Sequence, residues 1–347
     1  TPAVFNADAT VRTVNVDTTG AAATVTVDGA AYTFEGSGTL TVAGGSTLAL
    51  GTASKSSTLT DVRTVFSSGT ATVDVSGTVT VTGEDVWTFA DGSALNLVSS
   101  SGAGTLILQS DTVLPDTVVI GDGVTLKIGT KTYLTGRSSA PIALTIKDGG
   151  QLVLTDQSSY LAHPLDLTVE SGGKINFSSN ARTALVAYSY VLDGTTKNPG
   201  RYAVSGDSTH LSGVDQSAIL VPHAIWTGGA GDGKWGSTSN WKDKKHPTYL
   251  TSNPIIDISQ ATGNVALSSS VTLKGLTYLP SAPGSVCRLS AGETSSSCTF
   301  AAESWGVLCM VGRNRTLELD CDLSLPNAIG IQVIVGNIIP ESLIEFD

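Results

Sequence analysis

The segment LTVESGGKINF (residues 167–177) joins two short alternating stretches through a polar turn that contains two glycines. Its apolar residues are Leu167, Val169, Ile175 and Phe177, and within each stretch one polar residue separates them. Because side chains point alternately to the two faces of a β-strand, this spacing predicts two strands that each bury one face. Glycine suits the turn between them because it adopts a positive φ without steric cost.

Five earlier segments share this pattern, with a glycine at the sixth position: LTVAGGSTLAL (40–50), TVFSSGTATVD (64–74), WTFADGSALNL (87–97), VVIGDGVTLKI (118–128) and LTIKDGGQLVL (144–154). The starts of the six segments are separated by 24, 23, 31, 26 and 23 residues. A period of about 20–30 residues is typical of the coils of a parallel β-helix. The lack of two-residue Asn-Gly loops also favours coils over hairpins. We expect an all-β, right-handed parallel β-helix, and a β-sandwich or barrel array is the alternative.

The composition agrees with strands and excludes several classes of partner. The chain has 38 Gly, one Met and only 14% charged residues, a bias toward strands and turns rather than helices. Its net charge of -11 is the wrong sign for binding nucleic-acid phosphates. No apolar run reaches the length of a membrane-spanning helix. We therefore expect no nucleic-acid partner and no membrane insertion, and an acidic protein that is soluble outside the cell.

A second type of pattern surrounds the stretch WTGGAGDGKWGSTSNW (226–241). A closing element precedes it, formed by Leu192, Asp193, Gly194, Pro199, Gly200, Tyr202 and Gly213. The opening element itself consists of Trp226, Gly228, Gly229, Trp235, Asn240 and Trp241. It is followed by Pro254, Asp257 and the strand-like VTLKGLTYL (271–279), and YTFEGSGTLTV (32–42) is similar to the later part of such a unit.

This order resembles the modules of the autotransporter-associated β-helical repeat family of bacterial surface and secreted proteins. The resemblance covers most of residues 1–279 and implies a passenger-like scaffold on or outside the cell, with no common set of catalytic residues. Residues 280–347 depart from the family pattern. We expect a β-helical repeat domain at 1–225 and a smaller, partial β module at 226–347 with a Trp-rich opening and a Cys-rich C-terminal part.

The module order also indicates that the chain was processed from a longer protein or is completed by its neighbours. The chain begins inside one module and stops inside another, and it starts at Thr1 rather than at Met. We expect that an upstream segment was removed. The chain is then either a piece of a longer repeated protein or a subunit whose ends complete its neighbours.

Three tryptophans in the opening element have two interpretations. Trp226, Trp235 and Trp241 are either a platform on which sugar rings stack or a structural cap where one coil stack meets the next. The cap is favoured because the rest of the core consists of small residues. The glycine-rich GGAGDG (228–233) is similar to calcium-binding turns but occurs only once, so a plain turn is favoured there.

The four cysteines lie near the C-terminal end of the chain, at Cys287, Cys298, Cys309 and Cys321. Their spacing does not match a CxxC-type metal site. We expect two disulfides formed in an oxidising compartment, with three pairings open. Four reduced, buried thiols are the alternative.

Signals of catalysis are weak. The histidines at 163, 210, 223 and 246 are scattered, and no GxSxG or HExxH motif is present. Asp91, Asp122, Asp148 and Glu170 stand at similar turn positions, so they could form a ladder like those of β-helical polysaccharide lyases, or a weak calcium site. Solvated acidic turns are favoured. We therefore predict no catalytic residue, no metal site and no cofactor.

The most apolar run is IGIQVIVGNII (329–339). It is either a buried terminal strand pair or an edge that joins another chain, with Ile331, Val333, Val335 and Ile338 as the candidate assembly residues. The end coils of a solenoid expose unpaired backbone and must be capped or must meet another subunit. We therefore expect self-association.

These observations favour a non-enzymatic, extracellular structural or adhesive protein that assembles into a larger surface structure or filament. A carbohydrate-active β-helix is the alternative, either as a glycan-binding module or as a polysaccharide lyase or hydrolase. The expected partners are other copies of a repeated surface protein, with a glycan as a second candidate.

Overall fold

The fold is known from a computed structural model. It describes residues 3–5, 13–15, 20–27, 32–36, 38–51, 56–83, 87–129, 132–155, 160–161, 163–177, 184–213, 217–247, 254–280, 282, 284–292, 296–300, 307–311, 315–324 and 331–335.

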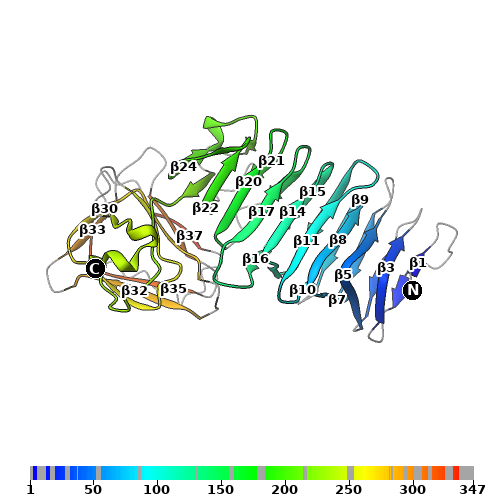
Figure 1. Cartoon of the computed structure of the whole chain (residues 1–347), viewed down its shortest axis with the longest axis horizontal. Helices are drawn as coiled ribbons and strands as arrows, with labels where there is room; N and C mark the ends of the chain where they lie inside the picture. The colour runs from blue at the N-terminus through cyan, green and yellow to red at the C-terminus, as the bar shows by residue number, and fades with distance from the viewer. Residues whose placement is uncertain are drawn as a thin grey trace.

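Strands from the first two thirds of the chain stack side by side into an elongated coil stack, with the N-terminus at its far end (Figure 1). One face is a 14-stranded sheet. Its main path runs through β1 (Ala3–Phe5), β3 (Gly20–Val27), β5 (Thr39–Leu50), β8 (Gly69–Val75), β11 (Ser93–Val98), β14 (Thr117–Ile120), β17 (Ile142–Ile146), β20 (Leu165–Val169), β22 (Ala184–Leu192), β26 (Ala218–Val221) and β24 (Gly200–Ala203). Strands β7 (Arg63–Phe66), β10 (Trp87–Phe89) and β23 (Thr195–Thr196) pair off this path.

Two further sheets lie beside it in this stack. The second is a nine-stranded sheet of β2 (Thr13–Asn15), β4 (Thr33–Glu35), β6 (Ser57–Thr60), β9 (Gly77–Thr82), β12 (Gly104–Leu108), β15 (Val124–Ile128), β18 (Gln151–Leu154), β21 (Lys174–Phe177) and β25 (Leu211–Ser212). The third contains β13 (Thr112–Leu114), β16 (Tyr133–Gly136) and β19 (Tyr160–Leu161). Among the described strands every pair is parallel except β22–β23 and β24–β26. The prediction of an all-β, parallel β-helical chain is confirmed.

The coil register explains the one irregular spacing in the sequence repeat. Ala94 of β11 lies opposite Thr117 of β14, which lies opposite Ala143 of β17. In the first three repeat segments the second half therefore lies on the main path of this sheet (β8 after β7, for example), whereas in the last three the first half lies on it (β14 before β15). The 31-residue step between 87 and 118 is a shift from one corner of the coil to the next, and not a longer coil.

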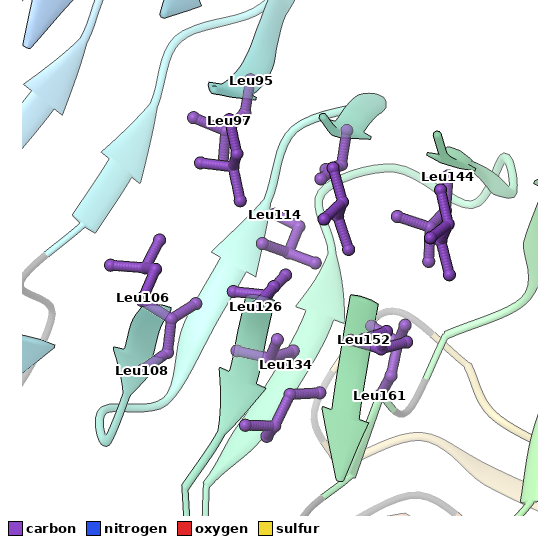
Figure 2. Packing of buried hydrophobic residues seen from close by; sticks show 14 of the residues in the cluster. Leu95, Leu97, Leu106, Leu108, Leu114, Leu126, Leu134, Leu144, Leu152 and Leu161 are labelled. Atoms are coloured by element: carbon purple, nitrogen blue, oxygen red, sulfur yellow. The ribbon is translucent and has the colours of Figure 1, made fainter. Parts of the chain in front are cut away.

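The interior of the stack is filled by columns of aliphatic side chains, as the alternation predicted. In the segment 167–177, all four predicted core residues are fully buried: Leu167, Val169, Ile175 and Phe177. Leucines from successive coils lie above one another, as with Leu106, Leu126 and Leu152 on three neighbouring strands of the nine-stranded sheet (Figure 2). Each such leucine contributes roughly 1.5–3 kcal/mol by leaving water, so the stabilisation is spread evenly along the stack.

The predicted turn glycines are used as expected in five of the six segments. Positive φ angles occur at Gly45, Gly69, Gly92, Gly123 and Gly149. Gly172 does not have one. A Cβ there would lie 1.7 Å from Oδ1 of Asp148 in the preceding coil, so close approach between coils is what favours glycine at that position.

A second coil stack follows, with its own three parallel sheets. Its largest sheet contains β27 (Ala224–Ile225), β28 (Ile255–Asp257), β31 (Gly275–Tyr278), β34 (Val307–Val311) and β37 (Ile331–Val335). The other two are β29 (Gly263–Ala266), β32 (Val286–Ser290) and β35 (Thr316–Asp320), and β30 (Val271–Leu273), β33 (Ser297–Phe300) and β36 (Asp322–Ser324). The hydrogen-bonded sheets change over between β26 and β27, next to the boundary at residue 225 expected from the sequence.

The two stacks are in contact through a separate small apolar cluster. It combines Ala184, Val186, Ala218 and Leu220 of the first stack with Ile255 and Leu279 of the second. The intervening residues of the same strands, such as Leu185 and Ile256, point into the two main cores. Residues 184–187 of β22 and the whole of β26 and β28 are therefore buried on both faces, and the joint is a face-to-face contact of two sheets.

Candidate functional site

The tryptophan-rich opening element lies at the start of the second stack and is folded around its three rings. Trp226, Trp235 and Trp241 have 3%, 0% and 2% of their surface exposed. The ring of Trp241 meets those of Trp226 and Trp235 edge to face, with centroid distances of 5.2 and 4.7 Å. Edge-to-face contact is a favoured geometry of aromatic pairs.

Backbone contacts connect this aromatic cluster to the first coils of the second stack. The amide of Trp235 donates to the carbonyl of Ala266 in β29, and the amide of Trp226 donates to that of Asp257 in β28. The rings join the same core as Ile256, Leu276 and Cys287. This is the arrangement of a structural cap. A sugar-stacking platform needs exposed ring faces, which these three buried rings do not have.

The carbonyl of Trp235 accepts two hydrogen bonds within the cap. The indole nitrogen of Trp241 donates to it over 2.8 Å, and Nε2 of His246 lies 2.7 Å away. Since a carbonyl only accepts, the proton of the neutral His246 ring lies on Nε2. Burial lowers the pKa of His246, which agrees with a neutral ring.

The glycine-rich loop 228–233 is held by an amide and a carboxylate. The buried side chain of Asn240 donates to Oδ1 of Asp232 over 2.7 Å and to the carbonyl of Lys234 over 3.0 Å, and its oxygen accepts from the amide of Ala230 over 2.8 Å. Ser237 and the amide of Lys234 also donate to Asp232. These bonds, led by that of Ser237, lower the pKa of Asp232 to about 2. Three donors thus occupy the carboxylate that a calcium ion would need, as expected for a plain turn.

The acidic turn residues are only partly brought together. Ile120 and Ile146 are paired in register, so Asp122 and Asp148 lie at the same corner in consecutive coils. Glu170, one coil further on, pairs with Lys147, whose Nζ lies 2.6 Å from its Oε1. That bond lowers the pKa of Glu170.

Asp91 is separate from this column, because it follows β10 at another corner of the coil and pairs there with Arg137. Arg137 also donates to the carbonyl of Phe89, so it fastens the loop after β16 to an earlier coil. Within the described residues, no group of three or more His, Cys, Asp or Glu side chains is arranged to hold a metal ion.

His163 and His223 are engaged with the backbone. Nε2 of His163 lies 2.8 Å from the carbonyl of Ala140, and Nδ1 of His223 accepts from the amide of Ile255. Burial lowers the pKa of both rings. These contacts are structural ones.

His210 has polar contacts at both of its ring nitrogens. Its Nδ1 lies 3.1 Å from both carboxylate oxygens of Asp207, and its Nε2 lies 3.1 Å from the carbonyl of Ser171. The same Nε2 lies 3.5 Å from Oδ1 of Asp193. The ring therefore ties the end of the closing element to the turn after β20, a role that the sequence pattern did not suggest.

The cysteine-rich part does not show the predicted disulfides. Cys287 and Cys298 are buried in the core of the second stack, against which Cys321 packs, and no disulfide joins these three residues. The fourth, Cys309, lies on β34, and its side chain is outside the described residues. Burial raises the pKa of the Cys287 thiol to about 12. The described cysteines thus do not support the disulfide prediction, and Cys287 and Cys298 fit the alternative of buried thiols.

The candidate assembly edge falls on β37. Ile331, Val333 and Val335 pair in parallel register with Val307, Cys309 and Val311 of β34, and β37 is the last strand of its sheet in the described part of the chain. Ile338 lies outside the described residues. No helix in the described ranges is long and apolar enough to cross a membrane.

Sequence reasoning missed a buried carboxylate at the joint between the stacks. Asp257 is fully buried and accepts four hydrogen bonds, one of them from Tyr188 in the first stack. Its position in the apolar run PIIDIS was the available signal, because an acidic residue among buried ones needs partners.

The fold and these sites together define a parallel β-solenoid protein with a tryptophan cap at the start of its second coil stack. Comparisons of the chain with protein-family models, with curated protein sequences and with solved structures give no match. The resemblance to autotransporter-associated β-helical repeats therefore stays an expectation from the sequence.

Proposed function

We propose that this chain is a non-enzymatic, extracellular structural or adhesive protein whose stacked coils form a stiff element of a larger surface assembly. The proposal includes self-association with other copies of a repeated surface protein. The acidic composition, with a net charge of -11, and the resemblance to surface-protein modules support the extracellular part.

The regular coil register carries the structural part of the proposal. Along the nine-stranded sheet the same alternate positions are buried in coil after coil, for example Val79, Leu106, Leu126, Leu152 and Ile175. In a solenoid each coil contacts only its neighbours, so stability and stiffness are distributed along the axis rather than concentrated around one cleft. This is the mechanical property that a rod-like scaffold requires.

Electron microscopy and sedimentation across a range of concentrations test the proposal. Rods or fibres whose length or mass increases with protein concentration are the expected result. The same protein is incubated with a panel of polysaccharides, and no cleavage is expected.

Reproducible cleavage of a polysaccharide that Asp122→Asn or Asp148→Asn abolishes contradicts the scaffold and establishes the carbohydrate-active alternative. Asp91→Asn is the matched control, because this exposed carboxylate lies at a different corner of the coil. A protein that is monomeric at every concentration contradicts the self-association.

A further inference from the structure

The joint between the two coil stacks has an apolar part and a polar part. The apolar part is the cluster of small and aliphatic side chains from β22, β26 and β28, together with Leu279 directly after β31. None of these first-stack strands pairs through its backbone with the second-stack strands among the described residues. The connection from β26 to β27 does bond to the second stack, because the amide of His223 donates to the carbonyl of Ile255 in β28 over 2.8 Å. The described backbone bonds therefore hold the two sheets at this end and leave their alignment along the rest of the joint open.

The polar part is centred on Asp257. The hydroxyl of Tyr188 on β22 donates to its Oδ1 over 2.6 Å, across the joint and between residues 69 positions apart. From the second stack, the amide of Ser259 donates to Oδ1 over 3.0 Å. The hydroxyls of Ser259 and Thr277 donate to Oδ2.

Two further contacts surround this polar centre. The Ser259 hydroxyl accepts from the amide of Leu279 over 2.8 Å, and Leu279 belongs to the apolar part of the joint. On the other side, Nζ of Lys242 lies 5.8 Å from the centre of the Tyr188 ring, at the distance of a cation–π contact. Lys242 begins the short helix η3 (Lys242–Lys244) directly after Trp241, so the tryptophan loop also reaches the joint.

We infer that Tyr188 and Asp257 form a lock that fixes the alignment of the two coil stacks and couples their opening. A carboxylate fully buried in a mainly apolar contact is costly unless its partners are in place. Only one alignment of the sheets brings Tyr188 onto Oδ1, so every displaced alignment leaves the carboxylate short of a donor. The apolar part alone has no such selectivity, because slightly shifted contacts between aliphatic side chains bury nearly as much surface.

The lock goes beyond the proposed scaffold role and does not depend on it, because its test measures amide protection at the joint itself. Amide hydrogen exchange is compared between the native protein and Tyr188→Phe, which removes the hydrogen bond that Tyr188 donates to Asp257 across the joint. We expect exchange at Leu279 and its neighbours in β31 to become about 10- to 100-fold faster. Exchange in β14 and β15, inside the first stack, stays unchanged.

Tyr202→Phe is the matched control. It also removes a phenol hydroxyl, but one that donates to Asn198, four residues away. This variant leaves the exchange of Leu279 as it is in the native protein. The lock is contradicted if Tyr188→Phe leaves exchange at Leu279 unchanged, or if it accelerates exchange equally in both stacks.

Discussion

The indole nitrogen of Trp241 donates a 2.8 Å hydrogen bond to the main-chain carbonyl of Trp235, and the two rings meet edge to face with a centroid distance of 4.7 Å. Trp235 in turn donates its amide to Ala266 in β29. One residue thus joins the aromatic cluster to the first coil of the second stack. The tryptophan-rich stretch is therefore a structural cap of the second stack. Its large rings close a core that is otherwise built from smaller side chains.

Replacement of Trp235 tests this structural role. Because its ring is fully buried, Trp235→Ala leaves a cavity and is expected to lower the free energy of unfolding by about 3–5 kcal/mol. Denaturant titration followed by circular dichroism measures the change. Val113→Ala is the control, because Val113 is 48% exposed and its truncation changes stability by no more than about 0.5 kcal/mol. A Trp235→Ala protein of native stability contradicts the cap.

Acid titration tests how much Asp232 stabilises the glycine-rich loop 228–233. Its pKa is lowered to about 2, so its stabilising contribution is complete above the ordinary pKa of an aspartate and is lost as the pH falls through about 2. We expect Asp232→Asn to lower the midpoint of thermal unfolding by a constant amount near neutral pH. The difference from the native protein shrinks as the pH drops from about 4 toward 2. A difference that is the same at pH 2 and pH 7 contradicts the assignment.

The alternation of single residues was enough to predict the strands and their buried faces. Leu167 and Ile175 follow from local sequence, because the period of two is a property of each strand alone. The phase of the coils does not follow from it. Two corners of the coil use the same strand–glycine–strand pattern, so Trp87 and Val118 look equivalent in sequence. Trp87 nevertheless lies on β10, off the main path of the 14-stranded sheet, and Val118 lies on β14, in that path.

The candidate sites differ in how far apart in the sequence their residues lie. The tryptophan loop was recognisable because Trp226, Trp235 and Trp241 are close in sequence and rare in composition. The lock was not, since Tyr188 and Asp257 are 69 positions apart and lie in different coil stacks. Likewise, the pairing of Arg137 with Asp91 could not be read from spacing, because it connects loops of different coils.

A glycine substitution tests how tightly the closing element sits on the first stack. Gly213 has a φ of 123°, and a Cβ there would lie 1.5 Å from the carbonyl oxygen of Phe177 in β21. Gly194 has a φ of 71° and no atom near its Cβ position. We expect Gly194→Ala to cost about 1–2 kcal/mol of unfolding free energy from backbone strain alone. Gly213→Ala is expected to cost about 1–3 kcal/mol more, because the β21 backbone must move.

Urea or guanidinium titration of the two alanine variants measures this difference. Gly206→Ala serves as the neutral reference, since Gly206 has neither a positive φ nor an atom near its Cβ position. Equal stability of the Gly194→Ala and Gly213→Ala proteins shows that the closing element is not seated on Phe177.

Alkylation of Cys287 tests the state of the second core. Burial raises the pKa of its thiol to about 12, and only the thiolate reacts with iodoacetamide. We expect Cys287 in the native protein at about pH 8 to be modified far more slowly than a cysteine in an unfolded peptide, and only as fast as the core opens. Peptide mapping by mass spectrometry follows the modification over time. The same mapping in denaturant without reductant modifies Cys287 fully if its thiol is reduced, whereas protection that only a reductant removes establishes a disulfide and contradicts the buried-thiol state.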